Sequence, residues 1–145
     1  MSEQPSAEPG RVMALDLGEK RIGVALSDEM RIAVKPLLVL KRKSRKEDFE
    51  RIGRLLTEHQ VTLLVMGLPV TLSGREGTKA AWVRDYTAAL GEHVSVPIEF
   101  WDESFSTIRA EAGLRARGVG TRRRRQQIDA AAAAVILQEY LDAQR

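Results

Sequence analysis

The order of hydrophobic and polar positions predicts three strands at the start of the chain. The first apolar run covers residues 12–17 and carries one carboxylate, Asp16, close to its end. A short polar turn that contains Gly18 follows, and a second apolar run begins at Ile22, which is the pattern of a β-hairpin. Residues 32–40 are predicted to form a third strand, in which Pro36 marks an edge position or a bulge.

Beyond residue 45 the pattern changes to strands that alternate with helices. A helix is predicted from about Lys46, and an apolar run at 61–66 that ends at Gly67-Leu68-Pro69 is typical of a strand covered on both faces. The next helix is expected to use Thr78 as its cap and to end at Gly91. A strand at 96–101, a helix at about 107–116 and a helix at about 124–143 complete the chain. The expected buried positions are Phe49, Ile52, Leu55, Leu56 and His59 in the first helix, and Ala81, Trp82, Tyr86, Ala89 and Leu90 in the second. The predicted fold class is α/β, with a mixed five-stranded sheet of antiparallel hairpins and then βα units, flanked by helices.

The composition indicates one globular domain, which we assign to residues 11–145, after a polar and disordered N-terminal tail at residues 1–10. The tail lacks the basic start and the apolar stretch of a signal peptide, and no run is long enough to cross a bilayer. We therefore expect a soluble, cytoplasmic protein. The chain has no cysteine, which excludes disulfides, cysteine–zinc sites and thiolate nucleophiles.

Positive charge is concentrated in two clusters, although the net charge is only +3. The first cluster comprises Lys41, Arg42, Lys43, Arg45 and Lys46, and the second comprises Arg115, Arg117, Arg122, Arg123, Arg124 and Arg125. One such cluster is usually a solvated surface. Two on a small domain favour a polyanionic partner such as nucleic acid.

Four carboxylates stand at unusual places in this pattern. Asp16 ends the first strand, Asp102 and Glu103 end the fifth, and Asp129 shares a helix face with apolar residues that must pack on the sheet. Each has an ordinary alternative, since Asp16 can begin a turn and Asp129 can pair with a nearby arginine. Because sites form where the strands of an α/β sheet end, we expect these side chains to converge. Carboxylates without His or Cys suit Mg²⁺ or Mn²⁺, and two such ions can support phosphodiester cleavage.

Four segments of the chain resemble the YqgF family, also called RuvX. They are residues 15–25 (LDLGEKRIGVA), 66–69 (MGLP), 102–107 (DESFST) and 129–133 (DAAAA), and the match runs in order from about residue 11 to residue 141. The resemblance implies an RNase H-like fold related to the RuvC resolvases. It also implies a metal-dependent endonuclease, acting in 5′-end maturation of the small-subunit (16S) ribosomal RNA precursor or in Holliday junction resolution.

The resemblance also implies roles for individual residues. Catalytic acids would be Asp16, Asp102, Glu103 and Asp129, with Asp16, Glu103 and Asp129 as ligands of Mg²⁺ or Mn²⁺. Gly18, Gly67 and Pro69 would form backbone turns near the substrate. Nucleic acid would be bound by Lys20, Arg21, Arg109, Arg115, Arg117, Arg122, Arg123, Arg124 and Arg125. Two departures are visible, because Ser104 replaces an arginine common in the family and Met66-Gly67 stands where RuvC relatives have an acid.

Two other functions fit parts of the pattern. A nucleic-acid-binding module with this fold and no catalysis would differ from a nuclease only in cleavage. An actin-like ATPase or sugar kinase would use Asp16-Leu17-Gly18 at a phosphate, but the chain is too short for two lobes around a nucleotide. The sequence does not decide whether the substrate is RNA or branched DNA. It also leaves the oligomeric state open between monomer and homodimer, although a junction with two-fold symmetry favours a dimer.

Overall fold

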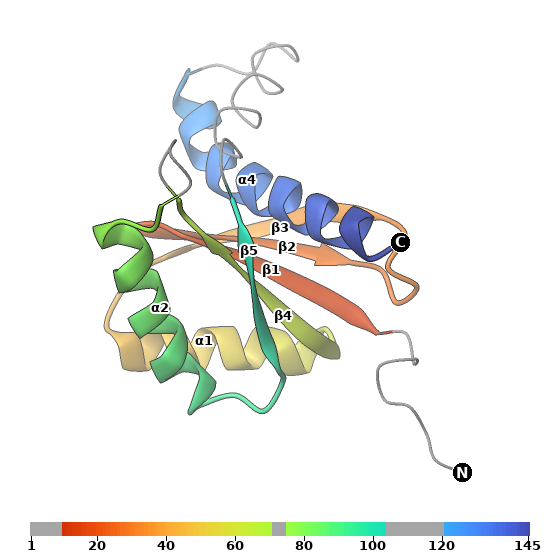
Figure 1. Cartoon of the computed structure of the whole chain (residues 1–145), viewed down its shortest axis with the longest axis horizontal. Helices are drawn as coiled ribbons and strands as arrows, with labels where there is room; N and C mark the ends of the chain where they lie inside the picture. The colour runs from red at the N-terminus through yellow and green to blue at the C-terminus, as the bar shows by residue number, and fades with distance from the viewer. Residues whose placement is uncertain (1–9, 71–74, 104–120) are drawn as a thin grey trace.

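A single mixed sheet organises the computed structural model, which describes residues 10–70, 75–103 and 121–145, with the backbone alone for residues 121–128. The strands are β1 (Arg11–Leu17), β2 (Arg21–Ser27), β3 (Val34–Lys41), β4 (Val61–Leu68) and β5 (Ile98–Asp102). The helices are α1 (Arg45–Glu58), α2 (Thr78–Gly91) and α4 (Thr121–Gln144). The strand order is β3-β2-β1-β4-β5 (Figure 1). The first three strands pair antiparallel, whereas β4 pairs parallel with both β1 and β5, which confirms the predicted mixed five-stranded α/β sheet.

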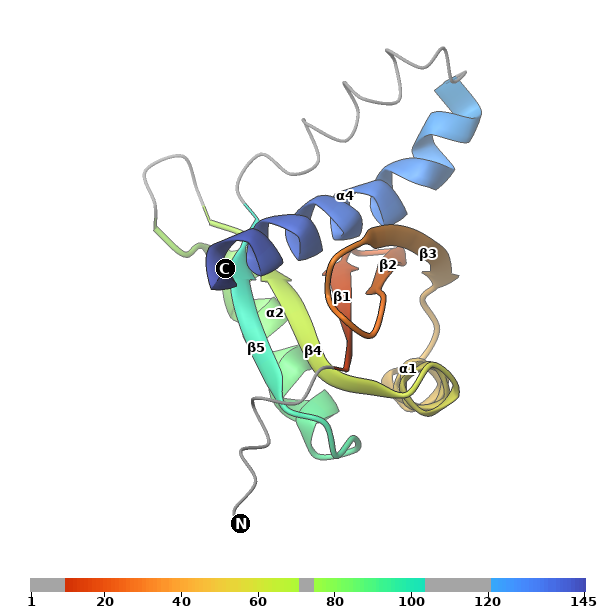
Figure 2. The same ribbon diagram turned by 90° about the vertical axis from the view of Figure 1, so that its right-hand side faces the viewer.

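The sheet lies between two helical layers, with α4 on one face and α1 and α2 on the other (Figure 2). Alternation along each strand sorts side chains between these layers. On β1, Val12 and Ala14 pack in the α4 layer, and Met13 and Leu15 pack in the α1/α2 layer. By the same alternation, Asp16 belongs to the α4 face.

The opening hairpin is confirmed and has a definite register. Asp16 pairs with Gly23 and Leu17 with Ile22, and the Gly18 amide donates a hydrogen bond to the Arg21 carbonyl at 2.8 Å. The prediction for Pro36 is confirmed in both forms, because β3 is an edge strand and its register with β2 shifts next to this proline.

Three predicted details are wrong. Strand β4 continues through Gly67 and Leu68, because both pair with β5. Helix α2 has Gly77 at its N-cap with no side-chain bond, so Thr78 is its first residue and not its cap. Its buried positions are Ala80, Val83, Tyr86, Thr87 and Leu90, so Tyr86 and Leu90 are confirmed, whereas Trp82 and Ala89 are only partly buried and Ala81 is exposed. Burial of Thr87 is possible because its hydroxyl donates to the Val83 carbonyl at 2.7 Å.

Helix α1 buries the predicted Phe49, Ile52, Leu55 and Leu56, and His59 is its C-cap. The predicted helix at 107–116 lies outside the described residues, as do residues 1–9 of the predicted tail. Gly10, the last residue assigned to that tail, is buried and accepts a hydrogen bond from Arg31. Among the described residues, no helix combines the length and the hydrophobicity needed to span a membrane.

A buried carboxylate, Asp48, connects the β3–α1 loop to both helices of one layer. It accepts hydrogen bonds from Arg51 at 2.8 Å and from the Tyr86 hydroxyl at 3.2 Å, and its carboxylate forms an ion pair with Arg42. Arg42 in turn donates to the Glu19 carbonyl at 3.1 Å. This network therefore attaches the β1–β2 turn, which begins two residues after Asp16, to the helical layer.

Candidate active site

Two carboxyl groups meet at the carboxyl ends of the parallel strands. Asp16 lies near the end of β1, and Glu103 directly follows β5, where its amide donates to the Leu68 carbonyl of β4 at 3.1 Å. Residues Glu99 and Trp101 of β5 contact Tyr140 of α4, so alternation along the strand directs Glu103 to the same face as Asp16. The side chains of Asp16 and Glu103 are hydrogen-bonded to each other.

Burial dominates the electrostatics of this pair. It raises the pKa of Asp16 well above its ordinary value, and the Glu103 carboxylate, the hydrogen bond to it and the Asp129 charge raise that pKa further. Burial also raises the pKa of Glu103, while the hydrogen bond from Asp16 opposes this rise. Burial therefore favours the protonated form of both carboxyl groups, and the neighbouring acids favour it further at Asp16.

Lys79, in the first turn of α2, is a member of the site that the sequence analysis missed. Its positive charge lowers the pKa of both Asp16 and Glu103. A lone lysine in an exposed first helical turn has no pattern that distinguishes it from a surface residue, so only its position relative to the pair identifies it.

Glycine at position 67 makes room for Glu103. A Cβ atom added there would overlap the Oε2 atom of Glu103 and would lie 2.6 Å from the Cδ1 atom of Ile136. Gly67, predicted as part of a turn near the substrate, is instead the strand residue against which the carboxylate packs. Oε2 of Glu103 is buried and has no hydrogen-bond partner among the described residues, so one acceptor of the pair is unsatisfied.

Asp129 approaches the pair from α4. The helix backbone crosses directly over Gly23, the residue paired with Asp16, and a Cβ atom at Gly23 would overlap the Asp129 carbonyl. The predicted packing of Ala132, Ala133, Ile136 and Tyr140 on the sheet is confirmed. The carboxylate of Asp129 accepts a hydrogen bond from Nε of Arg21 at 2.7 Å, so the arginine partner proposed as its alternative role is present, although on β2.

Asp102 points away from this group. Phe100 packs in the α1/α2 layer, so the alternation of β5 places Asp102 on that side, where its charge acts on Arg84 of α2. Asp102 is exposed, whereas burial raises the pKa of Glu103. The structure thus brings together Asp16, Glu103 and Asp129 and leaves Asp102 outside this group.

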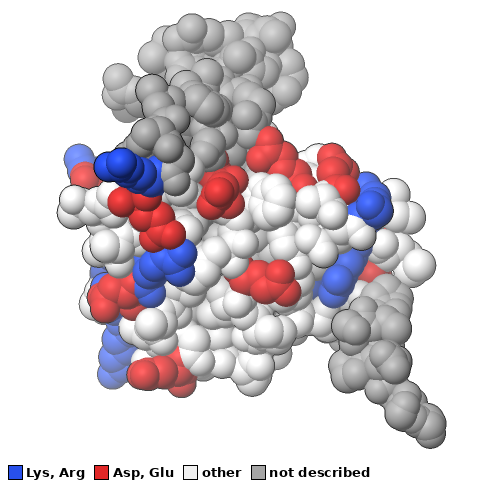
Figure 3. Space-filling model, viewed as in Figure 1, with Lys and Arg blue, Asp and Glu red and all other residues white. Residues whose placement is uncertain are grey.

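The remaining predicted residues fall into two groups. Lys20 and Arg21 are described and exposed at the β1–β2 turn, where Gly18 closes the hairpin, and Pro69 follows β4. Arg109, Arg115 and Arg117 lie outside the described residues, and Arg122, Arg123, Arg124 and Arg125 are described only as backbone of α4. On the face shown in Figure 3, acidic side chains are spread over the middle and basic ones lie toward the margins.

The acidic side chains at this end of the sheet are potential ligands of a divalent ion. Within the described residues, no three Asp, Glu, His or Cys side chains are already arranged to hold a metal, and Asp129 is paired with Arg21. The Asp16–Glu103 pair nevertheless has suitable chemistry, because both side chains are hard oxygen donors and no described residue bonds to Oε2 of Glu103. Magnesium is commonly bound through one or two carboxylates together with substrate phosphate. The residues present fit such an ion.

Comparison with known proteins agrees with this architecture. The sequence profile described as "RuvX: Holliday junction resolvase" matches residues 10–143. The chain is 44% identical over 140 residues to a protein named "Putative pre-16S rRNA nuclease" from Roseiflexus sp. (strain RS-1), covering 97% of this chain and 99% of that protein. It is 41% identical over 135 residues to a protein of the same name from Myxococcus xanthus (strain DK1622), covering 93% and 89% respectively.

Two solved structures share the fold at low sequence identity. Thermus thermophilus RuvC, in complex with a Holliday junction substrate, superposes with a TM-score of 0.59 and 16% identity over 92% of this chain and 94% of its own. Fowlpox virus resolvase, also in complex with Holliday junction DNA, gives a TM-score of 0.59 and 11% identity over 92% and 98%. The fold is therefore RNase H-like, and the chain belongs to the RuvX family, also called YqgF.

Proposed function

We propose that this protein is a divalent-metal-dependent endonuclease that hydrolyses phosphodiester bonds in structured RNA, with the 5′ end of the 16S ribosomal RNA precursor as its substrate. One observation carries the proposal: a buried, hydrogen-bonded pair of carboxyl groups, Asp16 and Glu103, in which the Glu103 Oε2 atom has no hydrogen-bond partner within the part of the chain that the structure describes. Membership of a family of nucleases supports the reaction class, and the names of relatives at 40–44% identity support RNA as the substrate.

The roles follow from the positions of the side chains. Asp16 and Glu103 would hold the ion, and Asp129 would complete the acidic group from α4. When bound, Mg²⁺ or Mn²⁺ supplies activation of water and stabilisation of the leaving oxygen. Deprotonation of the pair precedes binding, because a carboxylate and not a carboxylic acid is the ligand. Lys79 favours that deprotonated state, since its charge lowers both pKa values.

Branched DNA is the second candidate substrate. The family description names a Holliday junction resolvase, and both structural neighbours described above are complexes with such junctions. Those neighbours are under 20% identical to this chain, so they support the fold and leave the substrate to experiment.

The test compares cleavage of a 16S precursor RNA and a synthetic four-way DNA junction with Mg²⁺, with Mn²⁺ and with EDTA. We expect cleavage of the RNA, and complete loss of cleavage with EDTA. Asp16→Asn and Glu103→Gln should each lower the rate by about a hundredfold or more, since each removes an acidic oxygen that the reaction requires. Cleavage of the junction alone would support the second candidate.

Asp102→Asn is the matched control for Glu103→Gln. It removes one negative charge from the adjacent residue, but on the opposite side of the sheet. We expect it to retain the wild-type rate. Equal losses in both variants would contradict the assignment of Glu103. Tight binding of both substrates without cleavage by the wild type, under any of the metal conditions, would instead support a binding module.

A further inference from the structure

A cationic cleft lies beside the candidate active site and is not needed for the chemistry described above. It measures about 350 Å³, and its described lining residues are Lys20, Arg21, Val39 and Lys41. Three of these four residues are positively charged and none is acidic. Lys20, Arg21 and Lys41 are all exposed, so their charged groups can reach a ligand from solvent.

The pairing of β2 with β3 makes this charge density unusual. Arg21 and Lys41 are directly opposite each other in the antiparallel register. Like charges at directly opposed positions destabilise a sheet, whereas an anion bound between them removes the repulsion. Among these three side chains, the negative charge of Asp129 neutralises only that of Arg21, whose Nε donates a hydrogen bond to the Asp129 carboxylate. Lys20 and Lys41 make no ion pair with an acid among the described side chains.

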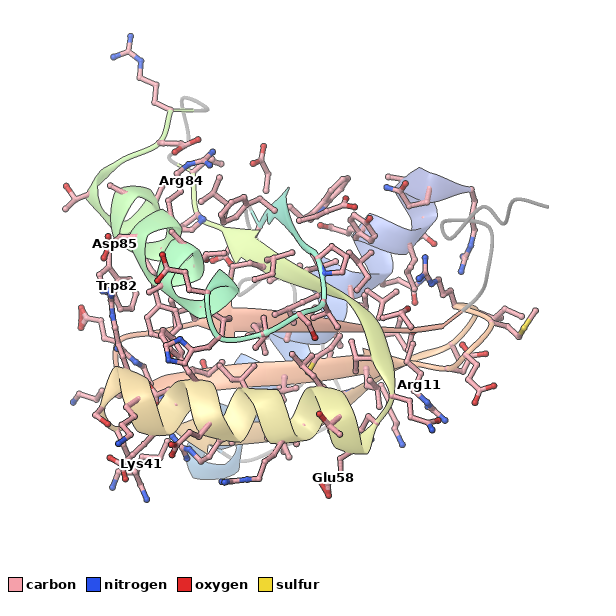
Figure 4. All side chains as sticks on the ribbon, turned by 90° about the horizontal axis from the view of Figure 1, so that it is seen from below. Arg11, Lys41, Glu58, Trp82, Arg84 and Asp85 are labelled. Carbon is pink, nitrogen blue, oxygen red and sulfur yellow. The ribbon has the colours of Figure 1, made fainter. Side chains whose placement is uncertain are left out.

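The cleft and the acidic group are on the same side of the sheet and at the same end. Arg21 contacts Asp129 of α4, and its cross-strand partner Lys41 shares its face. Figure 4 shows Lys41 at the end of the molecule opposite Arg11, where β1 starts, so Lys41 lies at the end where β1 terminates near Asp16. Two strand spacings separate β1 from β3, which is about 10 Å. A strand cleaved at the acids could therefore extend into the cleft.

We propose that the cleft formed by Lys20, Arg21 and Lys41 is a subsite for a phosphate of the nucleic-acid backbone, on the same strand as the bond that is cut. The position of this phosphate relative to the cleaved bond rests on the proposed function. Binding of the phosphate itself requires only a nucleic-acid backbone. Arg21 links the two places, because it can bind either this phosphate or Asp129. Backbone contacts of this kind determine the register of a strand and carry no sequence information.

The test measures binding and not cleavage, so that it stays interpretable if the protein is no nuclease. The probe is a fluorescein-labelled single-stranded RNA of about 16 nucleotides, titrated in EDTA at several salt concentrations and followed by anisotropy. For a single strand, each phosphate contact contributes about 0.7 to the slope of log Kobs against log salt. Because the cleft holds one phosphate, Lys41→Gln should lower the slope by at most about 0.7, and Lys20→Gln/Lys41→Gln should lower it by about 0.7 in total.

Lys35→Gln is the matched control, because Lys35 is also exposed on β3 and loses the same charge, but it pairs with Leu26 far from the cleft. We expect this variant to keep the wild-type slope. An unchanged slope in Lys41→Gln, or an equal fall in Lys35→Gln, would overturn the subsite. Melting temperatures within about 1–2 °C of wild type verify folding, as expected for exposed positions. Failure of the wild type to cleave either the RNA or the junction, with Mg²⁺ or with Mn²⁺, would refute the nuclease proposal, and the binding result could still be interpreted.

Discussion

Gly23→Ala tests whether close contact between β2 and α4 sets the position of Asp129. A Cβ atom at residue 23 would lie 2.9 Å from the Ala130 amide nitrogen and would overlap the Asp129 carbonyl. Ordinary Cβ contacts begin at 3.4 Å, so the helix backbone would have to retreat by more than 1 Å. No rotamer change can relieve this clash, because the three nearest atoms to the Cβ all belong to the backbone of α4.

The energetic effect follows from the packing of that helix. Helix α4 packs on the sheet through four fully buried side chains, those of Ala132, Ala133, Ile136 and Leu137. If the helix moves away from the sheet, all of these contacts are loosened. Overpacking of this kind costs about 1–3 kcal/mol. For a chain of this size, that corresponds to a fall in melting temperature of about 3–10 °C. The displacement also moves Asp129 away from Asp16. We therefore expect the cleavage rate to fall by more than the decrease in the folded fraction can explain.

Gly53→Ala is the opposite case and serves as the control. Residue 53 lies inside α1, and a Cβ atom there meets nothing within 4 Å. Alanine should therefore stabilise the helix by about 1 kcal/mol and leave cleavage unchanged. Circular dichroism melting and RNA cleavage would be measured on both variants. Wild-type stability and activity in Gly23→Ala would refute the argument that the glycine determines where Asp129 lies.

Three further outcomes are expected. Gly67→Ala should displace the Glu103 carboxylate and reduce cleavage, with a loss of only about 1 kcal/mol or less by urea denaturation, because the Cβ meets the ends of two flexible side chains; full activity would contradict the packing described. Asp48→Ala should lower the free energy of unfolding by about 3–5 kcal/mol, because it strands the buried Tyr86 hydroxyl and arginine partners; a change below 1 kcal/mol would argue against the network. Because the pKa of Asp16 is raised in the folded state, its stabilising contribution is present below the unfolded pKa and is lost as pH rises through the folded pKa. The melting temperature of metal-free Asp16→Asn should therefore increase relative to wild type as the pH rises above the ordinary pKa of an aspartate, about 4, and a constant difference would refute the shift.

Most of the fold could be predicted from local patterns. The alternation of residues 12–17, the apolar run at 61–66 and the helical spacing of Phe49, Ile52 and Leu55 each reflect a periodicity that burial imposes on one element. Details that depend on neighbours were predicted less well. The stripe of α2 was shifted because Thr87 can be buried once its hydroxyl bonds within the helix, and β4 was ended too early because pairing with β5 overrides the glycine at position 67.

The sequence by itself determined which acids are available, since Asp16, Glu103 and Asp129 stand at the ends of elements or on a packed face, where an unpaired charge is costly. Only the tertiary structure decided which of them meet. Glu103 and not Asp102 joins Asp16, because strand alternation sends neighbouring side chains to opposite faces and the position of α4 makes those faces different. Lys79, Arg21 and Lys41 acquire their roles in the same way, since a charge acts through distance in space and not along the chain.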